Sequence, residues 1–398
     1  MRNDKSVCLM VTDEITAVTF LRGYLGFLHR SGWDVSVVAS STGRLEELAL
    51  AEGVSALNLP MRRNPAPIKD LISLGGAIHI LLSVRPEVVV SATPKAGLIG
   101  MIAARLTGVP VRIYQIWGLR LETEGGIRRK LFLLLERIAA RLATQVVANS
   151  ESLADEIRRL GISAGPVVLG SGSSHGVDLN HFSREAKDLA QGDIPDLAAL
   201  GMRKGEFTVG YVGRVHHDKG VATLLSAVQA LSKNGRKVNL LVVGPAEDAS
   251  LERELEASCT ENLRIISIGA VADTRPYFLL MDVHCLPTRR EGFPNVVLEA
   301  ASLGVATITT CATGARDSVI QGRTGLIVAV DDTAELAEAL ERIASDPPFG
   351  VALGNAARAH VTQNFAHEKV FALQELNLHT ARRAARNSSE NNMSGGGE

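Results

Sequence analysis

Two glutamates flank a tight turn in the run PTRREGFPNVVLEA at 287–300, where Glu291 and Glu299 stand eight positions apart. The apolar segment before this run predicts a strand that ends near residue 286, and a helix is expected from about 295. Pro294 suits the approach to a helix, and Asn295 is a plausible N-cap. Both carboxylates then accept hydrogen bonds from vicinal hydroxyls, which sugars and ribose carry, while the helix amides face an anion. The alternative is a surface loop with two solvated acids.

A second run, GYVGRVHHDKG at 210–220, places two cations ahead of another expected helix. A predicted strand delivers Gly213 and Arg214 to its carboxyl end, and Lys219 follows five positions later. Arg binds a diphosphate bidentately and Lys binds it as a point charge, so the pair suits a pyrophosphate. The alternative is an exposed basic loop in which Asp218 simply pairs with Lys219.

The elements that must position these groups form two series of strands alternating with helices, which predicts parallel sheets covered on both faces. Strands are expected at 7–11, 35–40, 88–91, 111–116 and 145–149, then at 207–211, 239–243, 263–268, 283–286, 307–310 and 325–328. Helices are expected at 19–30, 98–107, 221–232, 251–259, 274–281, 295–303, 333–345 and 351–364. Open parallel sheets bind ligands at the carboxyl ends of their strands.

The length of 398 residues fits two α/β domains. The Gly-, Ser- and Asp-rich segment at 165–205 interrupts the alternation of strands and helices. It is therefore expected to connect the two domains, with a helical linker around 184–200. We therefore expect Rossmann-like domains at 1–180 and 181–365. A helix at 366–386 is expected to return toward the first domain, followed by a disordered tail at 387–398.

Composition argues against several classes of protein. Aromatic residues make up 4% of the chain and the net charge is -1, which disfavours nucleic-acid binding. The sequence has no Asp-x-Asp triplet and no His/Cys cluster with ligand spacing, so we expect no metal and no cofactor. Three of the four scattered cysteines lie in or beside apolar runs, which predicts buried free thiols and a reducing compartment. A polar start without a signal peptide, and no membrane-spanning apolar run, predict a cytoplasmic protein.

The Glu-x7-Glu and Gly-Arg-x4-Lys-Gly runs, with Thr313-Gly314 and the GRTG run at 322–325, resemble the retaining GT-B glycosyltransferases of family 4. The resemblance extends over nearly the whole chain. Runs at 92–97, 118–123 and 170–178 are similar to bacterial members that assemble capsule, exopolysaccharide or O-antigen. It implies two facing Rossmann-like domains with an interdomain cleft, a nucleotide diphosphate sugar donor (UDP-sugar favoured), a polyprenyl-diphosphate-linked saccharide acceptor, and transfer with retention and without metal.

The resemblance also implies roles for residues of the second, donor-binding domain. Arg214 and Lys219 would hold the diphosphate and stabilise the leaving group, Glu299 would bind the ribose, and Glu291 would contact the transferred hexosyl or N-acetylhexosaminyl group. We take Arg214, Lys219 and Glu291 as the catalytic set. The other expected donor contacts, several of them through the backbone, are Gly213, Val271, Ala272, Gly292, Phe293, Pro294, Asn295 and Val296.

Acceptor contacts are expected from loops of the first domain. The candidates are Thr16, Arg22, Lys95, Trp117 and Arg120. Related enzymes often carry a His near the donor sugar where this chain has Trp117, which either stacks on the sugar or packs against the interface. His175, in the Gly/Ser-rich crossing loop, either lies near the cleft or is a solvated bystander.

The segment at 126–143 reads as a basic amphipathic helix. Packing against the sheet is its favoured role, and peripheral contact with an anionic membrane at the inner face of the plasma membrane is a further hypothesis. Two other functions remain open for the whole chain: a sugar-nucleotide epimerase with a similar fold, and a non-catalytic sugar-nucleotide-binding subunit.

Overall fold

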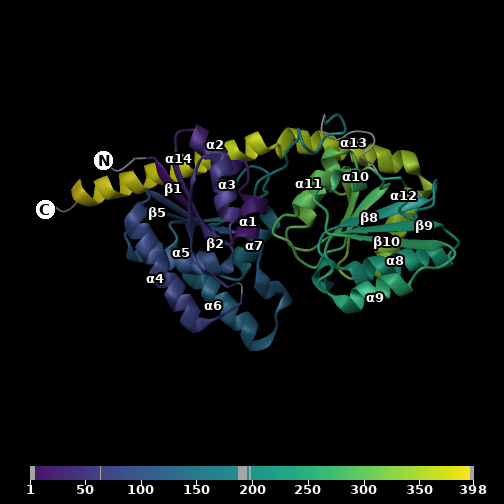
Figure 1. The fold of residues 1–398 in the computed structure, drawn as a ribbon, viewed down its shortest axis with the longest axis horizontal. Coiled ribbons are helices and arrows are strands. Elements are labelled where there is room, and N and C mark those ends of the chain that lie inside the picture. The colour runs from purple at the N-terminus through teal and green to yellow at the C-terminus, as the bar shows by residue number, and fades with distance from the viewer. Residues whose placement is uncertain (1–4, 63, 187–194, 197–198, 395–398) are drawn as a thin grey trace. The chain divides into compact units, whose positions relative to one another are not determined.

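The computed structural model describes residues 5–62, 64–186, 195–196 and 199–394 of the chain (Figure 1). Two compact units emerge, Met1–His175 with Glu368–Glu398, and Gly176–His367. The chain changes units near the predicted boundary between 180 and 181, and each unit is built on one parallel sheet. Most of the linker expected at 184–200 lies outside the described residues, and 184–186 are not helical.

The first unit contains a seven-stranded sheet in the order β3-β2-β1-β4-β5-β6-β7, with every pair parallel. The strands are β1 (Ser6–Asp13), β2 (Asp34–Ser40), β3 (Ser55–Asn58), β4 (Val88–Ala92), β5 (Val111–Ile116), β6 (Gln145–Ala148) and β7 (Val167–Val168). The two edge strands, β3 and β7, escaped prediction because they are short and only half-buried. The five central strands were predicted from their continuous apolar runs.

Helices cover both faces of this sheet (Figure 1). Alternate β1 residues point to opposite faces, so Leu9 joins one core and Met10 the other. One face carries α1 (Glu14–Phe20), α2 (Tyr24–Arg30), α3 (Arg44–Glu52) and α14 (His367–Ser394). The other carries α4 (Pro67–Val84), α5 (Pro94–Leu106), α6 (Gly126–Leu142) and α7 (Glu151–Arg159).

Several helices of the first unit differ from expectation, and α3 and α7 were not predicted. The continuous helix predicted at 19–30 is divided into α1 and α2, because Gly23 adopts a φ of 79° between them. Helix α4 was not predicted, and it is long and apolar enough to cross a membrane by length and composition. Lys69 and Asp70 interrupt its apolar sequence, so the expectation of no uninterrupted apolar run of membrane-spanning length still holds for α4.

The second unit repeats the topology with a six-stranded sheet in the order β10-β9-β8-β11-β12-β13, again fully parallel. Its strands are β8 (Phe207–Val212), β9 (Val238–Val243), β10 (Leu263–Gly269), β11 (Val283–Leu286), β12 (Thr307–Thr310) and β13 (Gly325–Val328). One face packs on α8 (Val221–Lys233), α9 (Ala249–Ala257) and α12 (Thr333–Ser345). The other packs on α10 (Arg275–Phe278), α11 (Asn295–Ser302) and α13 (Pro347–Asn364).

The final helix, α14, is grouped with the first unit. Its Glu375 accepts a hydrogen bond from the Trp33 indole at 3.0 Å, and Arg382 pairs with Glu87 at 2.6 Å. The helix continues to Ser394, beyond the end expected at 386, so residues 387–394 are helical rather than the disordered tail that we predicted. Residues 395–398 of that tail lie outside the described chain.

All four cysteines are free. Cys8 and Cys285 are buried in the sheets, whereas Cys259 and Cys311 are exposed. The expectation of buried thiols is therefore correct for the two strand residues and wrong for the two that stand in loops.

Candidate active site

The predicted donor residues gather where the strand order of the second sheet reverses. Strands β8 and β11 are neighbours there, although other elements separate them in sequence. The loop after β8 carries Lys219, and the loop after β11 carries Glu291. Their side chains form an ion pair with 2.5 Å between Nζ and Oε1, and both are largely buried. The structure thus joins the two predicted motifs directly, at the place where open α/β sheets bind ligands.

Two glycines allow the loops around this pair to interlock. Gly220 has a φ of 70°, and a Cβ at this position would collide with the carbonyl oxygen of Pro287 at the end of β11. Gly314, after β12, has a φ of 74°, and a Cβ there would collide with the carbonyl oxygens of Glu291 and Gly292. The Glu291 amide also donates to the Thr313 carbonyl at 2.9 Å. The Glu291 turn is therefore held by backbone contacts on two sides.

The alternative in which Asp218 pairs with Lys219 is not observed. Asp218 instead interacts with a different set of charged side chains. Its carboxylate lies 3.2 Å from Arg290 Nη2 and 2.5 Å from His216 Nδ1. Burial opposes ionisation, yet the hydrogen bond with His216 and the charges of Lys219 and Arg290 hold the pKa of Asp218 below its ordinary value. The Asp218 carbonyl accepts from the Arg289 amide at 2.9 Å, so Asp218 links the two loops. Sequence reasoning missed Arg290, whose only signal was its place beside Glu291.

Arg214 lies at the carboxyl end of β8 but is not paired with the Glu291 turn. Its guanidinium contacts Glu247 in the loop after β9, and both side chains are exposed. Its carbonyl accepts a 2.6 Å hydrogen bond from the buried Tyr211 hydroxyl, which fixes the backbone of the loop. Burial raises the pKa of Tyr211; the negative charge of Glu291 adds to this effect and the positive charge of Arg214 opposes it. Both charges therefore act on the same hydroxyl.

Glu299 stands in α11, the helix that follows the Glu291 turn. Its side chain is half-buried, and this burial raises the pKa of the carboxyl to about 7. No hydrogen bond or ion pair to its carboxylate was found among the described residues. Asn295 is the first helical residue rather than the predicted N-cap, and Pro294 occupies the cap position without a side-chain hydrogen bond.

The remaining donor candidates differ in how deeply they are buried and in which strand they follow. Gly292, Phe293 and Pro294 are buried in the turn, and Phe293 packs against Phe365. Val296 is partly buried between two cores of the second unit. Gly213 follows β8, whereas Val271 and Ala272 follow β10, at the same carboxyl edge of the sheet.

In the first unit, the strand order of the sheet reverses between β1 and β4, which is the place that corresponds to β8 and β11 in the second unit. Here the Thr12 and Thr93 hydroxyls lie 2.6 Å apart, so the contact is between neutral groups. The acceptor candidate Lys95 opens α5 but already pairs with Asp70 of α4 at 2.6 Å, and it also donates to the Asn64 carbonyl. Thr16 donates to Asp13, the cap of α1, and Arg22 is exposed between α1 and α2.

Three aromatic rings meet near the carboxyl ends of strands in the first unit. Trp117, just after β5, stacks on Phe20 with centroids 4.9 Å apart, and Phe20 contacts His175 edge-on at 5.4 Å. Trp117 is only partly buried, so part of its surface remains available to a ligand. Arg120 instead lies over the Phe132 ring and near Glu124. Sequence reasoning had named Trp117, His175 and the segment from Thr16 to Arg22 separately, and Phe20 of that segment joins the two rings.

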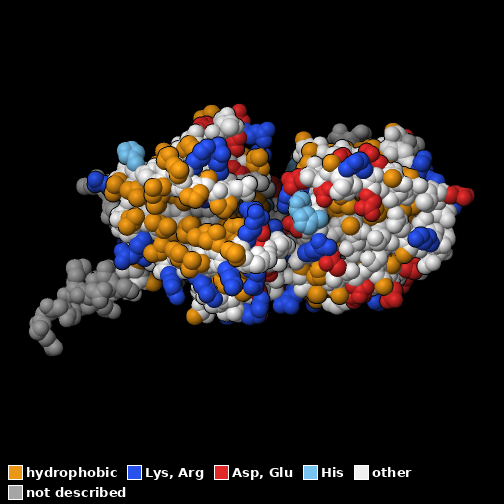
Figure 2. Space-filling view, turned by 90° about the horizontal axis from the view of Figure 1, so that it is seen from below, with side chains coloured by type: hydrophobic (Ala, Val, Ile, Leu, Met, Phe, Trp, Pro, Cys, Tyr) orange, Lys and Arg blue, Asp and Glu red, His pale blue; other side chains and the backbone are white. Residues whose placement is uncertain are grey.

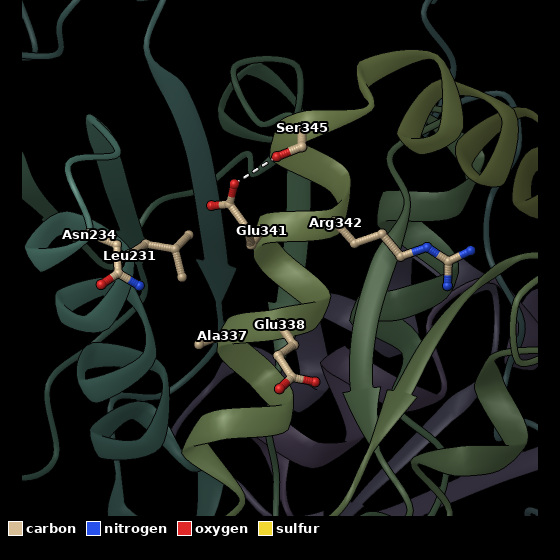
Figure 3. Close-up of a pocket in the computed structure, with 7 residues that line it drawn as sticks. All are labelled: Leu231, Asn234, Ala337, Glu338, Glu341, Arg342 and Ser345. Atoms are coloured by element: carbon tan, nitrogen blue, oxygen red, sulfur yellow. Dashed lines mark hydrogen bonds between the residues drawn. The ribbon is translucent and has the colours of Figure 1, made fainter.

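A surface pocket of the second unit lies elsewhere, between α8 and α12 (Figure 3). Its lining residues are Leu231, Asn234, Ala337, Glu338, Glu341, Arg342 and Ser345. Glu341 is already bound by Ser345 and Arg236. None of the predicted site residues lines this pocket, so it is not the candidate site. Within the part of the chain that the structure describes, no group of three or more His, Cys, Asp or Glu side chains is arranged to hold a metal ion.

Comparison with known families agrees with this geometry. The family described as "Glycosyl transferases group 1" matches residues 206–346, and the "Glycosyl transferase 4-like domain" matches residues 17–171. The crystal structure of Anabaena HepE in complex with UDP has a TM-score of 0.74 and 20% identity, over 94% of this chain and 100% of that one. The two parallel α/β units therefore have the GT-B glycosyltransferase fold.

Two relatives with assigned functions support the assignment of this chain to a family. The "Capsular polysaccharide biosynthesis glycosyltransferase CapM" of Staphylococcus aureus is 36% identical over 93% of this chain and 96% of its own length. The "UDP-Gal:alpha-D-GlcNAc-diphosphoundecaprenol alpha-1,3-galactosyltransferase" of Escherichia coli is 26% identical over 80% of this chain and 82% of its own. This chain belongs to the family 4 glycosyltransferases of GT-B fold.

Proposed function

We propose that this protein transfers a hexosyl or N-acetylhexosaminyl group, with UDP-sugar as the favoured donor, to a polyprenyl-diphosphate-linked saccharide in the assembly of a bacterial surface polysaccharide. The observation that carries the proposal is the Lys219–Glu291 pair at the switch point of the second sheet. The names of the two relatives support the polysaccharide, the uridine nucleotide and the lipid-linked acceptor.

In the proposed complex the donor diphosphate binds between Lys219, Arg214 and the amides at the start of α11. Arg214 exchanges its exposed contact with Glu247 for the diphosphate, a small cost because surface ion pairs contribute little. Glu299 accepts hydrogen bonds from the ribose hydroxyls, and Glu291 accepts from the sugar while it orients Lys219.

Transfer breaks the bond between the anomeric carbon and a β-phosphate oxygen and forms a bond from that carbon to the acceptor oxygen. Negative charge builds on the departing diphosphate, where the two cations and the helix amides stabilise it. With retention, the acceptor hydroxyl approaches on the face of the leaving group and its proton passes to the departing phosphate oxygen. We propose that these protein groups supply the required positive field without a metal.

The proposed acceptor places the reaction at the cytoplasmic face of the plasma membrane. Its saccharide and diphosphate contacts would come from the first unit, where Trp117 offers a ring for stacking and Thr16, Arg22, Lys95 and Arg120 offer polar groups. Because Lys95 is already paired with Asp70, we propose that it contributes less than Trp117.

The test is a transfer assay with a panel of UDP-sugars and a synthetic polyprenyl-diphosphate N-acetylglucosamine, with and without EDTA. We expect a product that needs both substrates, survives EDTA, and keeps the donor's anomeric configuration by NMR. Conversion of the donor alone to an epimer would instead identify an epimerase. UDP binding without transfer from any nucleotide sugar in the panel would indicate a non-catalytic subunit.

A further inference from the structure

The outward side of α4 is apolar, although α4 lies on the surface of the first unit. Its inward stripe of Ser73, Ala77 and Leu81 is buried against the core. The side chains turned to solvent include Ile68, which is 80% exposed, with Leu71, Ile72 and Leu82. Leu71 and Ile72 follow Ile68 at the helical spacing of three and four positions, and Leu82 lies fourteen positions after Ile68, about four turns further along the helix. A helix that is apolar on both sides is expected inside a protein or against lipid, not in water.

Helix α6 contributes a second apolar strip. Its buried residues are Glu136, Ala139 and Ala140, all in its carboxyl half. Ile127 is 86% exposed, and Leu131 and Leu134 follow it on the same side of the helix. The favoured expectation, that α6 uses its apolar residues to pack against the sheet, is met by Phe132 and Leu133, which pack against the core, whereas Ile127, Leu131 and Leu134 remain outside it.

These strips belong to one surface, because α5 packs against both α4 and α6 and adds exposed Leu106 at its end. Figure 2, which views the side where α4 and α6 lie in Figure 1, shows a broad apolar area on the first unit with Lys and Arg along its border. Single exposed apolar side chains are ordinary, whereas a contiguous patch rimmed by polar residues marks a binding surface.

The solvent-exposed charges on α4, α5 and α6 are all positive. The exposed cations are Lys69, Arg105, Arg128, Lys130 and Arg141. The acidic residues of α4, α5 and α6 are only two, and both are occupied: Asp70 pairs with Lys95, and the buried Glu136 accepts from Tyr114 at 2.6 Å. An apolar face bordered by cations complements an anionic bilayer. The same border repels a second copy of itself.

We propose that the outer face of α4, extended by Leu106 and the amino half of α6, lies on an anionic phospholipid bilayer. Because the Ser73–Ala77–Leu81 stripe is committed to the core, α4 lies along the membrane instead of crossing it. The inference rests on the proposed lipid-linked acceptor for its purpose, since docking would bring the first unit to a substrate that resides in the membrane.

Vesicle flotation of the full-length protein tests the proposal. We expect binding to vesicles of phosphatidylglycerol and phosphatidylethanolamine that weakens at high salt, and little binding to phosphatidylcholine alone. The triple variant Ile68→Ser, Leu71→Ser, Ile72→Ser should bind about tenfold less, because three exposed apolar side chains no longer reach the bilayer. Arg128→Glu with Lys130→Glu should weaken the anionic preference specifically.

The matched control removes three exposed apolar side chains elsewhere, through Leu50→Ser, Val351→Ser and Leu376→Ser, and should float like the parent. Parental binding by the α4 triple variant would overturn the proposal. So would a dimer that this variant dissociates while flotation is unchanged, since the patch would then be covered by a second copy. UDP binding and transfer to a short, water-soluble acceptor should survive in the variant. Their absence in the parent itself would overturn the proposed function instead.

Discussion

The two sheets share one strand order but carry different chemistry at the same topological place. In the second unit, the loops after β8 and β11 meet through a largely buried ion pair between Lys219 and Glu291. In the first unit, the end of β1 and the residue just after β4 meet through the hydroxyls of Thr12 and Thr93. The fold provides the meeting place in both, and the side chains decide what it can bind. A charged centre suits a diphosphate, whereas hydroxyls and the nearby aromatic rings suit a neutral saccharide.

The largest difference in activity is expected between two single variants, each of which removes the lysine at one of the two switch points. Lys219→Ala should lower kcat on the order of 10³-fold, because it removes a cation from the developing charge of the leaving group. Lys95→Ala should leave kcat near that of the parent and raise the acceptor KM by at most about tenfold, because its charge is already paired with Asp70. Steady-state kinetics measures both. Equal losses in kcat would remove the distinction between the two units.

The pH dependence of UDP affinity, which Glu299 is expected to control, provides a sharper test of the charged centre. Its pKa of about 7 means that the carboxylate forms as pH rises through neutrality, so UDP affinity should increase from pH 6 to pH 8 by roughly tenfold. Glu299→Gln should remove the part of this dependence that is not due to the phosphates. Calorimetric titration of both proteins at both pH values measures it. A parallel pH dependence in the two proteins would contradict the assignment of Glu299 to the ribose.

The neutral centre is tested by Trp117. Trp117→Ala should raise the acceptor KM by about fivefold to tenfold, since an aromatic face contributes about 1 kcal/mol of stacking. UDP affinity should not change, because the donor residues belong to the other unit. Trp33→Phe, a substitution in the buried core of the same unit, is the control for general destabilisation. A change in UDP affinity without a change in acceptor KM would reverse the proposed roles.

The smallest effect on activity is expected from Glu136→Gln, a change on the buried side of α6. Burial raises the pKa of Glu136 from 4.5 to about 7, so the unfolded state releases this proton first as pH rises. Glu136 therefore contributes stability that is complete below pH 4.5 and is lost as pH rises to about 7. The variant should lose this pH dependence and gain on the order of 3 kcal/mol relative to the parent at pH 8. Denaturant unfolding at pH 5 and pH 8 measures the difference, and a constant offset between the proteins would contradict it.

The sequence was most informative where local pattern and tertiary structure agree. The buried part of β1 at 7–11 is a continuous apolar run, and α12 was predicted residue for residue as 333–345. Helix α4 was missed because a helix with apolar residues on both sides lacks the one-sided period that marks an ordinary surface helix. The edge strands β3 and β7 are too short and exposed to show a run.

Within the site, the residue types were predictable and most of their partners were not. Lys219 and Glu291 are 72 positions apart and meet because β8 and β11 are neighbours, a fact of topology that spacing does not contain. For Asp218 the adjacent Lys219 was the obvious partner, yet Arg290 and His216 take that place. Arg214 binds Glu247, from a loop for which the motif gave no signal.

A crystal structure of the full-length protein with UDP tests the central claim most directly. It should show the diphosphate against Lys219 and the first amides of α11, Arg214 released from Glu247, and the ribose hydroxyls on Glu299. A nucleotide bound elsewhere, with the β8 and β11 loops empty and Arg214 still on Glu247, would contradict it.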